Sequence, residues 1–195
     1  MVEKSLQEMT LEELWRLFPI VLKGHDPQYK NWYQQQKEQI RSALSRQDIY
    51  RISHIGSTAV EGLTAKPTVD ILLEMNRNCD MGQVRQSLEQ SGWFFMSGEI
   101  QRECRLVFHK GYTPQGFAEK VFHLHVRRAG DWDELYFRDY LMTHPETAYA
   151  YAELKKCLCA QYKYNRDAYT QAKGDFIRTV THKARKEMQG KYAVE

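Results

Sequence analysis

Long hydrophobic runs are missing from this sequence of 195 residues. No stretch approaches the roughly 20 apolar residues that a membrane-spanning helix needs, and the first residues lack the apolar core of a secretory signal peptide. We therefore expect a cytoplasmic protein without a membrane partner. A strong charge of one sign is also missing: the net charge of +3 suits a small anionic ligand and gives no reason to propose nucleic acid binding.

Cysteine is scarce as well, with four residues: Cys79, Cys104, Cys157 and Cys159. None forms a C-x-x-C pair, and their spacing matches no zinc-binding pattern. Cys157 and Cys159 fall on a predicted helix, where residues two apart face different directions. We expect reduced, packed thiols rather than a metal or redox site.

Proline is rare too, with five in the chain, and no repeat or low-complexity segment divides it. A chain of this length can bury a substantial core, so we expect a single domain over residues 1–195. Thr10-Leu11-Glu12-Glu13 is a capping-box pattern that begins a helix within an N-terminal helical extension, residues 1–25. Asp26-Pro27 offers the cap of a second helix. Residues 131–190 are expected to form three C-terminal helices.

Strand patterns lie between these helical ends. Strands are expected over residues 49–55, 68–74, 93–96, 102–109 and 121–127, and a helix over 80–91 that Gly92 closes. The turn-rich residues 112–116 predict that the last two strands are antiparallel neighbours. The order of elements predicts an α+β fold, in which a mixed β-sheet is flanked by helices and followed by a C-terminal helical segment.

The stretch from His54 to Glu74 is the most informative part of the chain. It predicts a strand that ends in Gly56-Ser57, a short connection, and a hydrophobic strand that carries Asp70. A Gly-Ser turn exposes backbone N–H groups where a polyphosphate can approach, and a carboxylate on the next strand can hold a Mg²⁺ ion that neutralises it. Asp70 stands inside an apolar run, where a lone carboxylate is costly. The alternative is a structural ion pair with an arginine or Lys66.

Side-chain alternation places further polar groups on one face of each predicted strand. These faces carry Asp70, Leu72 and Glu74 on the second strand, Arg105, Val107 and His109 on the fourth, and His123, His125 and Arg127 on the fifth. If the faces coincide, they form one polar concavity. The alternative is a sheet face that simply meets water.

Several of these residues have more than one possible role. His123 and His125 are candidates for metal ligands, for a general base or for phosphate donors. Arg105 and Arg127 are candidates for phosphate contacts, against the alternative of ordinary surface arginines. Lys173, on the last predicted helix, can reach a triphosphate, although a solvated helix face explains it equally well.

Several short motifs occur in a single order over roughly residues 25–185. They are His54-Ile55-Gly56-Ser57-Thr58-Ala59-Val60, Gly62-Leu63, Ala65-Lys66-Pro67, Asp70-Ile71, His123-Leu124-His125-Val126, Phe137-Arg138-Asp139-Tyr140-Leu141, His144-Pro145-Glu146, Tyr169-Thr170, Ala172-Lys173 and Phe176-Ile177. Together they resemble the GrpB family, whose members are similar to the nucleotidyltransferase superfamily. The resemblance implies a nucleotidyltransferase-like fold with Gly-Ser beside the acidic strand.

The resemblance also implies a carboxylate pattern that this chain only partly matches. Active members of that superfamily pair Gly-Ser with two carboxylates two residues apart and a third on a neighbouring strand. Here Leu72 occupies the second place, and His123 and His125 stand where the third would fall. Glu74, on the same face, is the candidate to compensate, and histidines favour Mn²⁺ or Zn²⁺ over Mg²⁺.

We therefore expect metal-dependent transfer of a nucleotidyl or phosphoryl group to a small acceptor, with a nucleotide or another phosphorylated small molecule as partner. The expected catalytic residues are Asp70 and His125, the expected ligands of Mg²⁺ or Mn²⁺ are Asp70, Glu74, His123 and His125, and the expected substrate contacts are Gly56, Ser57, Lys66, Arg105, Arg127 and Lys173. One alternative is a catalytically degenerate module that binds a nucleotide or phosphate, which Leu72 favours. Another is a scaffold whose C-terminal helices bind a second protein.

Overall fold

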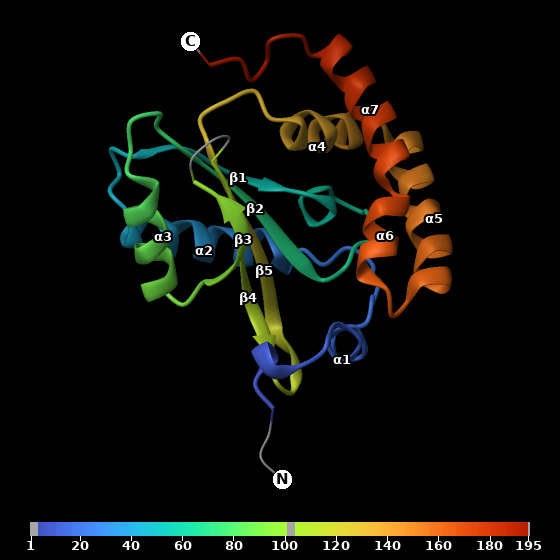
Figure 1. Ribbon diagram of the computed structural model, residues 1–195. Coiled ribbons are helices and arrows are strands. Elements are labelled where there is room, and N and C mark those ends of the chain that lie inside the picture. Colours follow the sequence, from blue (N-terminus) through green and yellow to red (C-terminus); the bar gives the residue numbers. More distant parts are fainter. Residues whose placement is uncertain (1–3, 101–103, 195) are drawn as a thin grey trace.

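The computed structural model describes residues 4–100 and 104–194. Its centre is a five-stranded sheet in the order β1-β2-β5-β4-β3 (Figure 1). The strands are β1 (Ile49–Ile55), β2 (Thr68–Met75), β3 (Phe94–Glu99), β4 (Arg105–Thr113) and β5 (Gly116–Arg128). The helices are α1 (Leu11–Leu17), α2 (Gln28–Ala43), α3 (Met81–Gln90), α4 (Asp133–Thr143), α5 (Pro145–Tyr162), α6 (Arg166–Ala172) and α7 (Gly174–Glu187), with short 3₁₀ turns η1 (Leu6–Glu8) and η2 (Ser57–Ala59).

The sheet is mixed, which confirms the α+β prediction. β2 and β5 run parallel, whereas β1–β2, β5–β4 and β4–β3 are antiparallel pairs. The predicted hairpin is confirmed, since Thr113 pairs with Gly116 across the β4–β5 turn. The parallel pair needs a long connection, which α3, β3 and β4 supply. Its register places Asp70 opposite His123 and Leu72 opposite His125.

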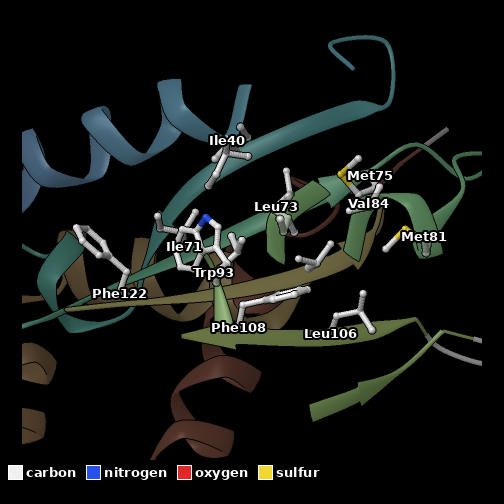
Figure 2. Packing of buried hydrophobic residues seen from close by; sticks show 14 of the residues in the cluster. Ile40, Ile71, Leu73, Met75, Met81, Val84, Trp93, Leu106, Phe108 and Phe122 are labelled. Atoms are coloured by element: carbon white, nitrogen blue, oxygen red, sulfur yellow. The ribbon is translucent and has the colours of Figure 1, made fainter. Parts of the chain in front are cut away.

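One face of the sheet packs against α2 and α3 (Figure 1). Val69, Ile71 and Leu73 of β2 are fully buried on this side. They join Ile40 of α2 and Val84 of α3 in the main hydrophobic cluster (Figure 2). Each such side chain contributes about 1.5–3 kcal/mol to the free energy of unfolding. Burial of these residues therefore fixes the register of the strands, and with it the positions of the side chains on the opposite face.

The opposite face lies toward α4–α7 (Figure 1). Leu72 of β2 and Ile55 of β1 pack there against Leu135 of α4. A second cluster joins α4 to α5 and α7 through residues such as Phe137, Tyr151 and Val180. No helix in the two described ranges is both long and apolar enough to cross a membrane.

Local signals set most helix ends. The predicted capping box is confirmed: Glu13 N–H donates to Oγ1 of Thr10 at 3.2 Å, and Thr10 N–H donates to the Glu13 carboxylate at 2.8 Å. The prediction of one last helix is wrong, because α6 ends at Ala172 and α7 begins at Gly174. Glycine has a low helix propensity, and the break leaves Lys173 at the junction.

Two further expectations need correction or restriction. All four cysteines are free, but Cys157 is exposed, so the expectation of packed thiols is wrong there; Cys79 and Cys104 are buried. The strand expected over residues 102–109 begins at Arg105 in the part of the chain that the structure describes. Residues 102 and 103 lie outside that part.

Candidate functional site

The connection from β1 to β2 begins with a glycine that other residues could not replace without strain. Gly56 has a φ of +71°, and a Cβ there would lie 2.5 Å from Oδ2 of Asp70. The hydroxyl of Thr58 fixes the next turn, because it donates to the carbonyl of Thr68 at 3.1 Å and lies 3.0 Å from Nε2 of His54. This short segment therefore passes directly over Asp70.

Asp70 and His123 face each other across the parallel strands β2 and β5. Oδ1 of Asp70 lies 3.0 Å from Nδ1 of His123, so the two residues share a face, as alternation predicts. Burial opposes ionisation, but the His123 hydrogen bond and the nearby charges of His125 and Lys66 lower the pKa of Asp70 to about 2. Burial also lowers the pKa of His123. Near neutral pH, Asp70 is thus an anion and His123 a neutral imidazole that donates its Nδ1 proton to it.

A hydrogen-bonded chain continues from His123 to the β4–β5 hairpin. Nε2 of His123 lies 2.8 Å from Oη of Tyr112, and Nη2 of Arg166 on α6 donates to the same oxygen at 2.8 Å. Because arginine can only donate and neutral His123 accepts at Nε2, the phenolic proton of Tyr112 is directed at His123. His109 stacks on His123, with ring centroids 4.1 Å apart. Asp70, His123, Tyr112 and Arg166 therefore form one continuous chain.

Three lysines approach the same region from separate segments. Nζ of Lys155 on α5 donates to Oγ of Ser57 at 3.0 Å. Nζ of Lys66 and Nζ of Lys173 lie 5.8 and 4.5 Å from the ring centroid of Tyr169. Burial, together with repulsion from neighbouring cations, lowers the pKa of Lys66 and of Lys155 to about 7 and that of Lys173 to about 8. Around Asp70, the positive charge of these lysines therefore exceeds the negative charge of the one carboxylate.

These side chains line one cavity of about 700 Å³ between the sheet and α4–α7, which we call the cationic cavity. Of the residues expected at a site, those that line it are Gly56, Ser57, Lys66, Asp70, Arg105, His123, His125 and Lys173. Lys155 and Arg166, which the sequence did not single out, line it as well. Its volume is within the range of small-molecule sites.

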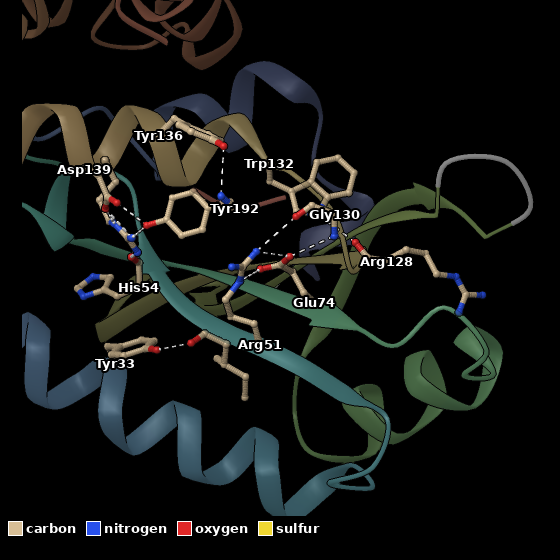
Figure 3. Close-up of polar contacts among 12 residues, drawn as sticks. Tyr33, Arg51, His54, Glu74, Arg128, Gly130, Trp132, Tyr136, Asp139 and Tyr192 are labelled. Carbon is tan, nitrogen blue, oxygen red and sulfur yellow. Dashed lines mark hydrogen bonds and ion pairs between the residues drawn. The ribbon is translucent and has the colours of Figure 1, made fainter. Parts of the chain in front are cut away.

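Glu74 and Arg127 lie elsewhere, so their expected roles need correction. Glu74 is fully buried and binds Arg51 through two contacts, Nε–Oε2 at 2.5 Å and Nη2–Oε1 at 2.8 Å (Figure 3). Arg127 is 6% exposed and donates to the carbonyls of Leu106 and Val126. Glu74 also accepts from the Gly130 N–H, and Arg127 lies beside Trp132 and Glu134, so neither residue lines the cationic cavity itself.

The residues present do not form the expected metal site. Within residues 4–100 and 104–194, no three His, Cys, Asp or Glu side chains gather closely enough to hold an ion. Both ring nitrogens of His123 are engaged, by Asp70 and by Tyr112, and Glu74 is bound to Arg51. The lysines beside Asp70 add positive charge that repels a divalent cation. This donor set fits an anion, and we derive no step through a metal.

Comparison with known proteins shows similarity to one protein family. A family model described as "GrpB protein" matches residues 19–183. The chain is 37% identical over 160 residues to a UPF0157 protein of Pseudomonas aeruginosa, an alignment that covers 82% of this chain and 65% of that protein. It is 30% identical over 162 residues to the glutamate-rich protein GrpB of Alkalihalophilus pseudofirmus, covering 81% of this chain and 91% of that protein.

Two further matches bear on length and fold. The UPF0157 protein YqkA of Bacillus subtilis is 29% identical over 86% of this chain, but the match spans only 48% of that protein. The chain thus spans about half to two thirds of the length of two of these relatives. The crystal structure of conserved protein GrpB from Enterococcus faecalis matches with a TM-score of 0.74 and 25% identity, covering 86% of this chain and 98% of that chain.

Proposed function

The chain belongs to the GrpB family, and from this premise and the charge of its cavity we propose that it binds a phosphorylated small molecule, in the first place a nucleoside triphosphate. We propose further that it transfers a phosphoryl or nucleotidyl group from this molecule to a small acceptor. Ser57, Lys66, Lys155 and Lys173 bind the phosphates. Asp70 and His123 handle the acceptor's proton.

One observation carries the proposal: four cations gather around Asp70, whereas the other carboxylates that line the cavity, Asp131, Asp133 and Glu134, lie beside Arg185 and Arg127. Lys66, Lys155, Lys173 and Arg166 line the cationic cavity around Asp70. In the described part of the chain, their hydrogen bonds and ring contacts are made to hydroxyls, a carbonyl and aromatic rings. Buried like charges repel and are costly without a counter-ion. A polyphosphate supplies the missing negative charge, and its several oxygens can reach several lysines at once.

Binding without turnover is the second candidate, and Leu72 favours it. Leu72 is fully buried between Ile55 and Leu135, so the position two residues after Asp70 offers no oxygen atom. A protein in which Asp70 is the one carboxylate among these four cations can hold a nucleotide without cleaving it. Release of phosphate or pyrophosphate from the bound nucleotide separates the two candidates.

ATP is expected to stabilise the protein in a way that depends on Lys173. At about 100 times the dissociation constant, binding adds about 2.7 kcal/mol, which raises the melting temperature of a domain of this size by about 5–10 °C. Lys173→Met should weaken ATP about tenfold, because a charge-assisted hydrogen bond is lost. Thermal shift with ATP, GTP and inorganic triphosphate, each with and without Mg²⁺, measures this. Lys183→Met, an exposed lysine on α7, is the matched control; equal shifts for both variants would contradict the proposal.

The ATP-dependent shift is also expected to fall as the pH rises. The pKa values of Lys66 and Lys155 near 7 and of Lys173 near 8 mean that these groups lose their charge through that range. In the unfolded chain they keep their protons to about pH 10, so the free energy of unfolding of the ligand-free protein gains from these groups as the pH rises. Melting curves at pH 6 to 9 should show the ATP shift shrinking. A shift that stays constant would count against the lysines as phosphate ligands.

A further inference from the structure

A second cavity adjoins the cationic one, and we call it the apolar cavity. It has a volume of about 390 Å³ and lies between the residues that follow α1, helix α2 and the β4–β5 hairpin. Its apolar lining includes Phe18, Ile20, Tyr29, Trp32, Phe117 and Val121. Such a lining suits the hydrocarbon or aromatic part of a small molecule rather than a phosphate.

The two cavities meet at three residues. Lys66, Thr68 and Arg166 line both of them. Tyr112 lines only the apolar cavity, whereas His123 lines only the cationic cavity. The 2.8 Å contact between Oη of Tyr112 and Nε2 of His123 therefore joins a residue of the apolar cavity to a residue of the cationic cavity.

The hydrogen-bonded chain consequently ends in the apolar cavity and begins beside the lysines. Tyr112 lines the apolar cavity, and its hydroxyl oxygen accepts a hydrogen bond from Nη2 of Arg166 at 2.8 Å. Nε2 of His123 is placed to accept the phenolic proton, and Asp70, 3.0 Å from Nδ1, is placed to stabilise the imidazolium that would result. This order resembles a general-base arrangement more than a static ion pair.

We infer that the apolar cavity binds the acceptor, a small molecule with an apolar body and a nucleophilic hydroxyl or amine, and that Tyr112, His123 and Asp70 accept its proton. The inference rests on the proposed function and adds the acceptor's class and place. It assigns Tyr112 as a catalytic residue that sequence patterns did not reveal.

The transfer step balances without a further reactant. A lone pair of the acceptor oxygen or nitrogen attacks phosphorus and forms the new bond, while the bond from phosphorus to the bridging oxygen of the nucleoside triphosphate breaks. The electron pair of that bond stays on the leaving phosphate or pyrophosphate, whose charge Lys155 and Lys173 stabilise. The acceptor's proton passes to Tyr112 as the phenolic proton passes to Nε2 of His123.

The test uses ATP with two apolar acceptors, benzyl alcohol and 2-phenylethylamine, and two polar ones, glycerol and ethanolamine. Products are detected by mass spectrometry and phosphate or pyrophosphate release is timed. Ala118→Trp places a large ring into the apolar cavity from an exposed position of β5, and Ser97→Trp on the exposed edge strand β3 is its matched control. Tyr112→Phe removes only the hydroxyl that contacts Nε2 of His123.

We expect the apolar acceptors to react at least tenfold faster than the polar ones. Ala118→Trp should raise their KM at least tenfold, and Tyr112→Phe should lower kcat about 100-fold. In both variants the ATP-dependent thermal shift should remain that of the wild type, and Ser97→Trp should change nothing. A pH profile of kcat that loses its acidic limb in Tyr112→Phe would separate a proton-transfer role from a structural one.

Two results would overturn the inference while leaving the proposed function intact: equal rates with polar and apolar acceptors, or unchanged kinetics in Ala118→Trp and Tyr112→Phe. ATP-dependent stabilisation with no transfer to any of the four acceptors would also overturn the inference and would favour binding without turnover. If ATP and inorganic triphosphate fail to stabilise even the wild type, the proposed function fails first. The thermal shift thus tells the two failures apart.

Discussion

Asp70→Asn is expected to tighten ATP binding and to abolish turnover at the same time. Asp70 is the anion among Lys66, Lys155, Lys173 and Arg166 in this part of the cationic cavity, so removing its charge removes a repulsion against phosphate. The gain in affinity should be roughly tenfold. The rate of phosphoryl or nucleotidyl transfer should fall about 100- to 10,000-fold, because the imidazolium of His123 loses its counter-ion.

Isothermal titration at about pH 6.5, where the three lysines are largely protonated, measures the affinity, and phosphate or pyrophosphate release measures the rate. Glu134→Gln is the control, since Glu134 lines the far end of the same cavity near Arg127. If Asp70 instead held a divalent ion, Asp70→Asn would weaken binding, and only when Mg²⁺ or Mn²⁺ is present. That outcome would restore the metal site that the donor geometry disfavours.

The second large effect concerns stability: Glu74→Gln is expected to lower the free energy of unfolding by about 3 kcal/mol. Glu74 is fully buried, and its partner Arg51 keeps 26% of its side chain exposed. Neutralising the carboxylate leaves the guanidinium without a counter-charge, and the melting temperature should fall by about 10 °C. Urea denaturation and calorimetry measure both quantities.

Two comparisons make this prediction specific. Glu89→Gln breaks a surface pair with Arg85, in which the side chains are 41% and 40% exposed, and should change stability by less than about 1 kcal/mol. Arg51→Met with Glu74→Leu replaces both charges by apolar groups and should recover most of the loss. ATP-dependent stabilisation should persist in all of these variants. If Glu74→Gln abolished the ATP-dependent stabilisation, Glu74 would have a role in the functional site.

The strands and their two faces could be predicted, because side chains along a β-strand alternate strictly between the two sides of the sheet. The limits of β1 match the sequence prediction, and Asp70 and His123 share a face as alternation requires. Glu74 and Arg127 lie on that same face, yet Arg51 binds Glu74 and Trp132 and Glu134 lie against Arg127. Alternation gives the side of a sheet on which a residue lies but not which helix covers it there. This is the physical reason for those two errors.

The roles of the lysines and of Tyr112 could not be predicted, because they depend on contacts between segments that are distant in the sequence. Lys155 and Ser57 are 98 residues apart, and Arg166 and Tyr112 are 54 apart, so no local pattern joins them. One signal for Lys155 was available. It lies three residues after Ala152 and three before Leu158, on the buried stripe of α5, where an unpaired lysine is rare without a function.

The parallel pairing of β2 with β5 also bears on how the molecule folds. Asp70 and His123 are 53 residues apart, and the chain must complete α3, β3 and the β4–β5 hairpin before β5 can align with β2. Such non-local contacts close at a large entropic cost and tend to form late. The hydrogen-bonded chain of Asp70, His123 and Tyr112 should therefore be absent from partly folded molecules, and only molecules that have finished folding should carry out the transfer.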